Sequence, residues 1–174
     1  MFCIQCGSPN IAFRVPEGDN RPRHICNDCG HIHYTNPKII VGTIPVFKDQ
    51  ILLCKRDIEP RKGYWNLPAG FLEDGESLMD GAQRELREEA IAKAQNLQLH
   101  TIYNVPHVSQ MYFFFICELM NGQFGIGQET SDAKLFKFDE IPWQELAFSS
   151  NKFALENLDK HNLSAKPHFG EYSK

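Results

Sequence analysis

Residues 70–89 read GFLEDGESLMDGAQRELREE, a glycine-rich loop that leads directly into a segment with helical spacing. Ser77 is the expected N-cap of that helix, with Asp80 three residues further on as a weaker form of the capping box. Four apolar residues recur at steps of three or four and predict one apolar face: Met79, Ala82, Leu86 and Ala90. This stretch therefore predicts a loop followed by an amphipathic helix.

Three acids of the expected helix, Glu85, Glu88 and Glu89, project on one side and flank its apolar face. Like charges at this spacing cost roughly 0.2–0.5 kcal/mol per pair. A bound divalent cation removes that cost, and Mg²⁺ suits hard oxygen ligands while bridging to substrate phosphates. Because Arg84 and Arg87 are interleaved with the acids, a salt-bridged, solvated surface fits these residues alone equally well.

The longer spacing around these acids matches a known signature. Gly70, five residues, Glu76, seven residues and then RELREE resemble the Nudix hydrolase box, Gly-x5-Glu-x7-Arg-Glu-apolar-x-Glu-Glu. The preceding GYWNLPAG is similar to the usual lead-in of that family. The resemblance implies an α/β fold, a Nudix α/β/α sandwich, and Mg²⁺- or Mn²⁺-dependent cleavage of a nucleoside diphosphate linked to another moiety.

The resemblance also implies roles for individual residues. Four groups would hold the metal: the Gly70 carbonyl oxygen and the carboxylates of Glu85, Glu88 and Glu89. Glu76 and Arg84 would tie the loop to the helix, with Arg84 as an ion-pair partner. A carboxylate must position or deprotonate the attacking water, and the candidates are Glu88 and Glu129. Glu129, in GQETSD, is equally well explained as a solvent-facing loop acid.

Two further residues are candidates for substrate binding. Arg56 follows the LLCK run, and Phe148 lies in the segment LAFSS, which persists in the resemblance although it is outside the box. Phe148 could stack on a base or a flavin ring. A core position at the start of a helix is the commoner role for such an aromatic residue.

The chain departs from the family box at its end. The box closes Glu-Glu-x-Gly, and Ile91 stands where glycine normally permits a left-handed exit from the helix. Without that glycine, the segment AIAKAQN can extend the helix to a stop near Asn96. The metal ligands precede this point, so the departure concerns only where the helix ends.

The first residues carry a separate motif. Cys3 and Cys6 form CIQC, Cys26 and Cys29 form CNDC, and a glycine follows each second cysteine. Two such knuckles are typical of a zinc ribbon, in which four thiolates complete a tetrahedral Zn²⁺ site. Two disulfides are the alternative, but the short paired spacing and a cytoplasmic location argue against them. Residues 1–34 are too short for a core, so we expect metal binding to supply their folding energy.

The rest of the chain alternates strands with two helices and predicts a mixed α/β domain at 38–160, followed by an unassigned tail at 161–174. A β-hairpin is expected over 39–57, with its turn at 48–50, and a loop over 61–76. Further elements are expected as strands at 98–105, 110–119 and 134–138, a glycine-rich loop at 121–128 and a helix at 150–158.

Composition narrows the function classes. The 174 residues are 42% hydrophobic and 23% charged, as in ordinary globular proteins, and the net charge of −4 lacks the basic surface expected for nucleic-acid binding. No signal peptide or membrane-spanning stretch is recognised, so we expect a cytoplasmic enzyme without a membrane or nucleic-acid partner. The expected ligand is a small dinucleotide or nucleotide sugar, and the expected assembly is a homodimer.

A ribbon joined to a Nudix domain resembles two groups. NADH pyrophosphatases, which also act on NAD-capped RNA, carry Ser-Gln-Pro-Trp-Pro-Phe-Pro-x-Ser, whereas here Ser109-Gln110 precedes the proline-free MYFFFICEL. The plant and bacterial FAD and ADP-ribose diphosphatases are similar nearly end to end, from Cys3 to Ser150. This second resemblance implies hydrolysis of FAD to FMN and AMP, or of ADP-ribose to AMP and ribose 5-phosphate. A non-catalytic nucleotide sensor is the remaining alternative, and it should have lost a metal ligand.

Overall fold

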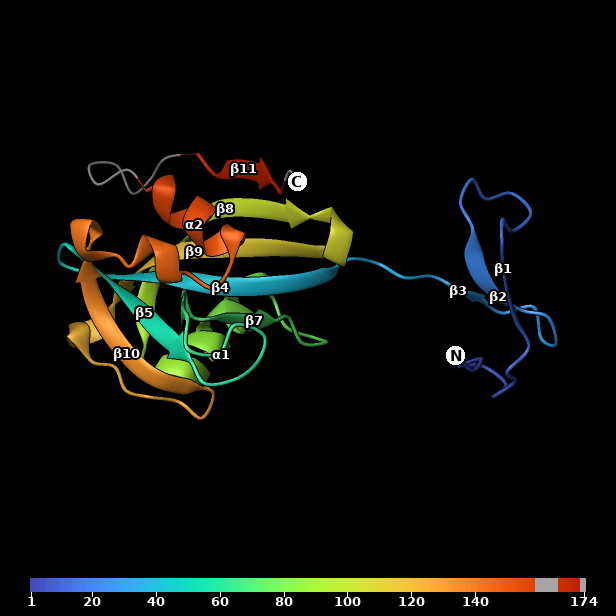
Figure 1. Cartoon of the computed structure of the whole chain (residues 1–174), viewed down its shortest axis with the longest axis horizontal. Helices are drawn as coiled ribbons and strands as arrows, with labels where there is room; N and C mark the ends of the chain where they lie inside the picture. The colour runs from blue at the N-terminus through green and yellow to red at the C-terminus, as the bar shows by residue number, and fades with distance from the viewer. Residues whose placement is uncertain (159–165, 173–174) are drawn as a thin grey trace. The chain divides into compact units, whose positions relative to one another are not determined.

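The computed structural model describes residues 1–158 and 166–172, and the chain divides into two compact units, Met1–Asn36 and Pro37–Lys174. The first unit is a three-stranded antiparallel sheet in the order β1-β2-β3 (Figure 1). Its strands are β1 (Ile11–Arg14), β2 (Arg23–Cys26) and β3 (Ile32–His33). Few side chains of this unit are buried, so it has almost no apolar core of its own.

The second unit is built on one mixed sheet in the order β10-β5-β4-β9-β8-β11. Its long strands are β4 (Lys38–Phe47), β5 (Gln50–Arg56), β8 (Ala94–Val105), β9 (Gln110–Leu119), β10 (Thr130–Lys137) and β11 (His168–Glu171). The pairs β4–β9 and β8–β11 are parallel, and the other neighbours in this order are antiparallel. The order brings β4, which follows the first unit, to the middle of the sheet.

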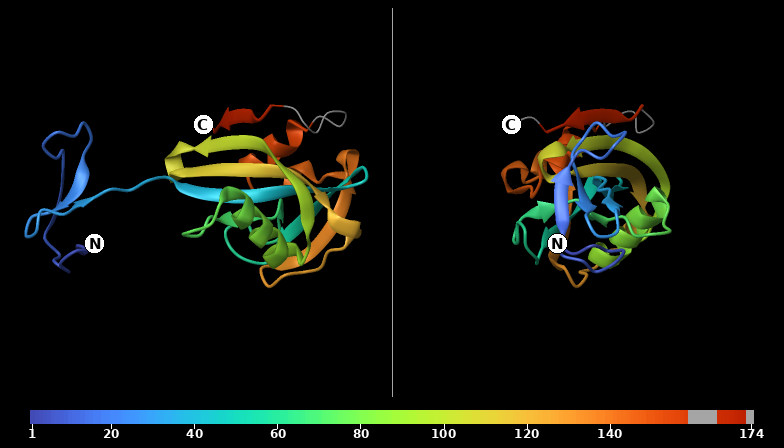
Figure 2. Two further views of the ribbon diagram at one scale, coloured as in Figure 1. Left: turned by 180° about the vertical axis from the view of Figure 1, so that it is seen from behind. Right: turned by 90° about the vertical axis from the view of Figure 1, so that its right-hand side faces the viewer.

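Two helices cover opposite faces of this sheet, α1 (Leu78–Ala90) and α2 (Ser149–Glu156) (Figures 1 and 2). Neighbouring residues of a strand point to opposite faces. Accordingly, Phe114 packs in one core cluster with Leu155 of α2, and Phe115 packs in another with Ala82 of α1. The predicted α/β/α sandwich is therefore confirmed.

Short turns of 3-10 helix connect several strands. They are η1 (Pro106–Val108), η2 (Met120–Gly122), η3 (Phe138–Glu140) and η4 (Trp143–Glu145). Among the helices of the described residues, none has the length and apolar character needed to cross a bilayer.

The predicted β-hairpin is present, but its two strands pair only next to the turn, through Val46–Ile51 and Phe47–Gln50. Beyond these pairs β4 and β5 separate, and two short strands fill the space between them. They are β6 (Trp65–Asn66), which pairs with β5, and β7 (Ala69–Phe71), which pairs with β4. The stretch 61–76, expected to be only a loop, thus joins the sheet and places Gly70 opposite Val41.

Helix α1 begins where it was predicted to begin, but it ends at Ala90 and does not extend toward Asn96. Ser77 is the N-cap, and its hydroxyl accepts a hydrogen bond from the Asp80 amide. Ile91 adopts the left-handed conformation, with φ 48° and ψ 35°, and its amide donates to the Arg87 carbonyl. The extension toward Asn96 was therefore wrong, because Ile91 takes the conformation normally reserved for glycine.

Other boundaries also differ from the expectations. Met79, expected on the apolar face of α1, is 45% exposed. Strands β8 and β10 each begin four residues before their expected starts, and α2 ends at Glu156 rather than at residue 158. The tail contains β11, although its residues 161–165 and 173–174, and the expected boundary at residue 160, lie outside the described residues.

Candidate active site

The loop before α1 brings backbone and carboxylate into direct contact. Gly70 on β7 lies against the side chain of Glu85, so that a Cβ added to Gly70 would overlap the Glu85 carboxylate. Only glycine therefore permits this approach. The sequence placed the Gly70 carbonyl and Glu85 in one site, and the structure brings these two residues together.

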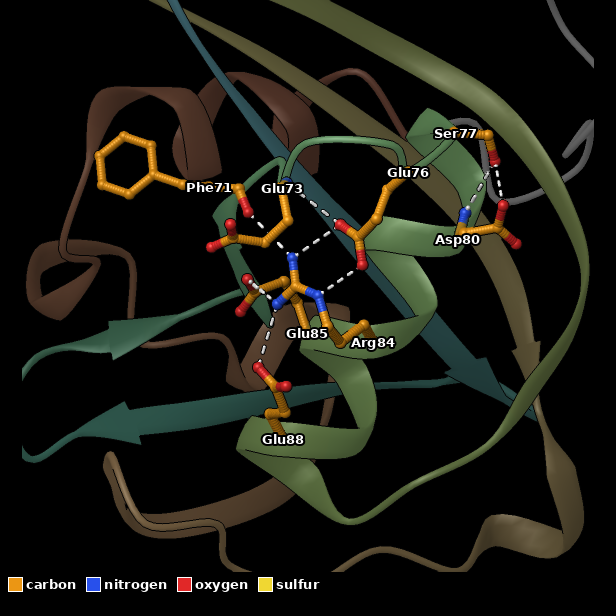
Figure 3. Close-up of polar contacts among 8 residues, drawn as sticks. All are labelled: Phe71, Glu73, Glu76, Ser77, Asp80, Arg84, Glu85 and Glu88. Carbon is orange, nitrogen blue, oxygen red and sulfur yellow. Dashed lines mark hydrogen bonds and ion pairs between the residues drawn. The ribbon is translucent and has the colours of Figure 1, made fainter.

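Arg84 organises the loop and the helix around one guanidinium (Figure 3). Its Nε donates to Glu76 Oε1 at 2.7 Å, and one terminal nitrogen donates to Glu76 Oε2 at 3.0 Å and to the Phe71 carbonyl at 2.9 Å. The other terminal nitrogen donates to Glu85 at 2.6 Å and to Glu88 at 3.0 Å. These bonds occupy all five N–H groups of the side chain.

This network has an electrostatic effect on Glu76. The hydrogen bond from Arg84 is the main cause that holds the pKa of the Glu76 carboxyl below its ordinary value. The Glu73 amide also donates to Glu76 Oε2, at 3.1 Å. Arg84 and Glu76 thus have the bracing geometry that the sequence predicted for them.

The three acids of α1 differ in exposure. Glu85 and Glu89 are buried, whereas the Glu88 side chain is 58% exposed. Burial is the main cause that raises the pKa of Glu89 to about 8, and the negative charge of Glu85 adds to it. Burial likewise raises the pKa of Glu85, while the hydrogen bond from Arg84 acts in the opposite direction and lowers it. Glu85 is paired with Arg84, and burying an ionised Glu89 beside it is unfavourable unless Glu89 is protonated or a further cation offsets its charge.

All of these acids line one cleft of about 880 Å³, within the size range of small-molecule sites. Glu129 lines the same cleft, and its negative charge contributes to the raised pKa of both Glu85 and Glu89. Glu88, Glu129 and the Gly70 backbone therefore surround the same space. The carboxylate and carbonyl oxygens are hard donors, the kind of ligand that divalent cations such as Mg²⁺ take in proteins.

The predicted substrate-binding residues lie in the same cleft and contact each other. The guanidinium carbon of Arg56 lies 5.2 Å from the centre of the Phe148 ring, over its face. The Arg56 Nε donates to the Pro60 carbonyl at 2.9 Å. Phe148 is partly buried, lines the cleft and immediately precedes α2.

Sequence reasoning missed several polar residues of the cleft, among them Asn66, Asn151 and Tyr112. The side-chain Nδ2 of Asn151 donates to Asn66 Oδ1 at 2.5 Å, and both residues are buried. For two of them the available signal was a polar group inside an apolar stretch. Asn66 stands in WNLP, and Tyr112 stands directly before three phenylalanines. That signal does not reveal that positions 66 and 151 meet.

The four predicted zinc ligands also come together. The Sγ atoms of Cys3 and Cys29, and those of Cys6 and Cys26, are each 3.6 Å apart, and all four lie within 4.8 Å of one another. Tetrahedral zinc–thiolate bonds of about 2.3 Å place sulfurs about 3.8 Å apart. None of the six cysteines is in a disulfide. The cluster fits a Zn²⁺ ion and not two disulfides.

Comparison with known proteins agrees with this geometry. The family model of the NUDIX domain matches residues 36–156, and the model described as Nudix N-terminal, a zinc ribbon, matches residues 1–35. The crystal structure of a NUDIX hydrolase from Nitrosomonas europaea is 43% identical, with a TM-score of 0.89 over 99% of both chains.

Two curated relatives carry named activities. The "ADP-ribose pyrophosphatase" of Methanocaldococcus jannaschii is 31% identical over 125 residues, which cover 68% of this chain and 72% of that protein. The "NAD-capped RNA hydrolase NudC" of Vibrio parahaemolyticus is 31% identical over 144 residues, 81% of this chain. The chain spans about half the length of the NudC relatives, with 52% of that protein covered. The box, the cleft and the matches together show that the chain belongs to the Nudix hydrolases and is a Nudix diphosphatase with an N-terminal zinc ribbon.

Proposed function

We propose that the protein hydrolyses the diphosphate bond of an adenosine diphosphate linked to a second moiety. The preferred substrates are FAD, giving FMN and AMP, or ADP-ribose, giving AMP and ribose 5-phosphate. The observation that carries the proposal is the single cleft that holds the acids of α1 beside Gly70 together with Arg56. The Methanocaldococcus relative, named ADP-ribose pyrophosphatase, supports this class of substrate.

The proposed metal site consists of the Gly70 carbonyl and the carboxylates of Glu85, Glu88 and Glu89. A bound Mg²⁺ or Mn²⁺ would neutralise the diphosphate and lower the pKa of an attacking water. Glu85 and Glu89, buried against the sheet, suit inner ligands, because a cation would offset the cost of burying their charge. The exposed Glu88 and the loop residue Glu129 are the two candidates for accepting the proton of the water.

Arg56 is the proposed contact for the substrate phosphates. Its Nε donates to the Pro60 carbonyl, and its guanidinium carbon lies over the Phe148 ring, so these two contacts hold the terminal nitrogens within the cleft. A guanidinium held in this way can bind two phosphate oxygens at once. In this arrangement Phe148 acts on the substrate mainly by orienting Arg56.

A second candidate function is hydrolysis of NADH or of an NAD cap, favoured by the similarity to the NudC relatives. The missing proline-rich motif after Ser109-Gln110 speaks against it. Intact acids at all three positions of α1 speak against a non-catalytic sensor. Zinc in the ribbon of residues 1–34, a catalytic domain over 38–160, a homodimer and a cytoplasmic location remain predictions.

The test is a substrate panel with product identification. The purified protein is incubated with FAD, ADP-ribose, NADH and a nucleoside triphosphate, each with Mg²⁺ and with a chelator, and the products are separated by chromatography. Metal-dependent release of AMP from FAD or ADP-ribose supports the proposal. Faster cleavage of NADH would favour the second candidate, and release of AMP from none of the four compounds would overturn the proposed function.

A further inference from the structure

The C-terminus of α1 is completed by a distant segment, Gly125–Glu129. The last carbonyls of a helix have no partner within the helix and must be satisfied elsewhere. The Ala90 carbonyl accepts from the Gly125 amide at 2.6 Å, and the Glu89 carbonyl accepts from the Gly127 amide at 3.0 Å. The segment therefore docks on the very turn of α1 that carries Glu88 and Glu89.

The contact at Gly127 has no room for a side chain. A Cβ added to Gly127 would overlap the Glu88 carbonyl oxygen, which is backbone and cannot move away without shifting the helix. A Cβ on Gly125, in contrast, would meet Ile91 side-chain atoms at 3.3 Å. The Ile91 side chain is largely exposed and can give way.

Glu129 follows Gly127 within one tight turn. The Thr130 amide donates to the Gly127 carbonyl at 3.2 Å, which closes a four-residue turn with Glu129 in its third position. On its other side, the Glu129 carbonyl accepts from the Asp57 amide at 2.8 Å. The backbone of Glu129 is thus held at both ends, and its side chain lines the cleft shared with the acids of α1.

We propose that Gly127 is a positioning residue for the reaction, because its docking against the Glu88 carbonyl sets Glu129 in the cleft beside Glu85 and Glu89. The inference rests on the proposed function in one respect: Glu129 must assist hydrolysis or cation binding. It also decides against the alternative of a solvent-facing loop acid, because Glu129 would be held in register with the metal-binding helix.

The test is a double-mutant cycle between Gly127→Ala and Glu129→Gln in the full-length, zinc-loaded protein. For a compound that the wild type hydrolyses, each single variant should lower kcat by about a hundredfold, the usual effect of misplacing a catalytic group, with little change in KM. Because α1 is packed against the sheet through its apolar face, the added methyl group should displace the segment Gly125–Glu129 and not the helix. The double variant should then be no slower than Glu129→Gln, because both changes remove the same group from the cleft. Gly125→Ala, a matched control in the same segment, should keep the wild-type kcat.

A second readout does not depend on turnover. Titration with Mn²⁺, followed by electron paramagnetic resonance without substrate, should show equally weakened binding in Gly127→Ala and Glu129→Gln, and no further loss in the double variant. The reason is that a carboxylate in the same cleft strengthens cation binding by its charge. If the wild type cleaves none of the panel compounds, the proposed function fails while this titration still decides the inference.

Two results would overturn the inference. One is a wild-type kcat, or wild-type Mn²⁺ affinity where no activity exists, in Gly127→Ala. The other is a double variant whose losses multiply, since Gly127 would then act independently of Glu129. Where Gly127→Ala does not fold, one glycine inserted after Gln128 leaves the Gly125 and Gly127 amides free to bond the end of α1 and lengthens the turn that holds Glu129. This insertion should reproduce the defect of Glu129→Gln, and wild-type behaviour in it would count against the positioning role.

Discussion

Arg84 and Glu76 form a two-pronged ion pair between the middle of α1 and the loop before it, with N–O distances of 2.7 and 3.0 Å. Both side chains are about 80% buried, with relative exposures of 20% and 21%. The pair joins the segment that contains Gly70 to the helix that contains Glu85. Its geometry depends on a planar guanidinium, because the same group also reaches Glu85, Glu88 and the Phe71 carbonyl.

Replacing this arginine by lysine should therefore weaken both stability and turnover. A lysine side chain at this position would keep the charge but could not make five fixed hydrogen bonds. We expect Arg84→Lys to lower the free energy of unfolding by about 2 kcal/mol, measured by urea denaturation, and to reduce kcat/KM at least tenfold. Arg87→Lys, an exposed arginine of the same helix, is the control and should change neither quantity.

Glu89→Gln should abolish turnover and leave the fold intact. Burial already favours the neutral form of Glu89, whose pKa is raised to about 8, so a neutral isostere should not lower the melting temperature without metal. The increase in melting temperature on adding Mg²⁺ should shrink in the variant, because a ligand that binds only the folded state stabilises it. Wild-type rates in Glu89→Gln would refute the metal-ligand role.

Cys26→Ser should remove zinc and unfold the ribbon before the Nudix domain. The ribbon has little apolar core, so its stability depends on the metal. Zinc content measured by mass spectrometry should fall from one ion per chain to near none. Cys117→Ala, which alters a buried cysteine far from the cluster in sequence, should retain the full ion. Full zinc stoichiometry in Cys26→Ser would contradict a four-sulfur site.

Ile91 occupies a left-handed conformation that a β-branched residue adopts only with strain. Its side chain is 64% exposed, so little burial is lost on substitution. Asparagine tolerates this conformation, so we expect Ile91→Asn to raise the free energy of unfolding by about 1 kcal/mol. Ile91→Val keeps the branching and should give no gain. A destabilised Ile91→Asn would show that side-chain contacts outweigh the strain.

Phe148 should influence substrate affinity through Arg56. Phe148→Leu keeps an apolar side chain but removes the aromatic face below the guanidinium. A cation–π contact of about 0.5–1 kcal/mol corresponds to a rise in KM of about two- to fivefold, with kcat little changed. Phe148→Tyr preserves the face and should behave as wild type. In the background Arg56→Ala, the change Phe148→Leu should have no further effect, and an undiminished effect there would show that the ring contacts substrate directly.

The sequence predicted best where the local pattern and the fold agree. Ser77 caps α1 as its hydroxyl and position suggest, and Glu76 pairs with Arg84 as the box spacing implies. The hairpin turn between Phe47 and Gln50 also lies where two β-branched runs meet a polar pair. In each case neighbouring residues contain the whole signal, so no distant contact is needed to interpret it.

The sequence-based predictions were wrong where contacts with residues distant in the sequence determine the local structure. The strands β6 and β7 form only because β4 and β5 separate, which no local pattern reveals. The end of α1 at Ile91 goes against local preference, and amides from Gly125 and Gly127 satisfy the carbonyls beside it. Met79 follows the helical period but is 45% exposed. Tertiary contacts overrode intrinsic propensity at these positions.

All N–H groups of Arg84 are bonded within the chain, and this affects how strongly the binding of metal and the binding of substrate depend on each other. Six acidic residues line the cleft against two arginines, and Arg84 has no N–H group left for a ligand. A diphosphate entering the metal-free cleft would meet net negative charge with Arg56 as its cationic contact among the described lining residues. Divalent cation and substrate should consequently bind with positive thermodynamic coupling, each tightening the other, and the apparent affinity for the nucleotide should track metal concentration.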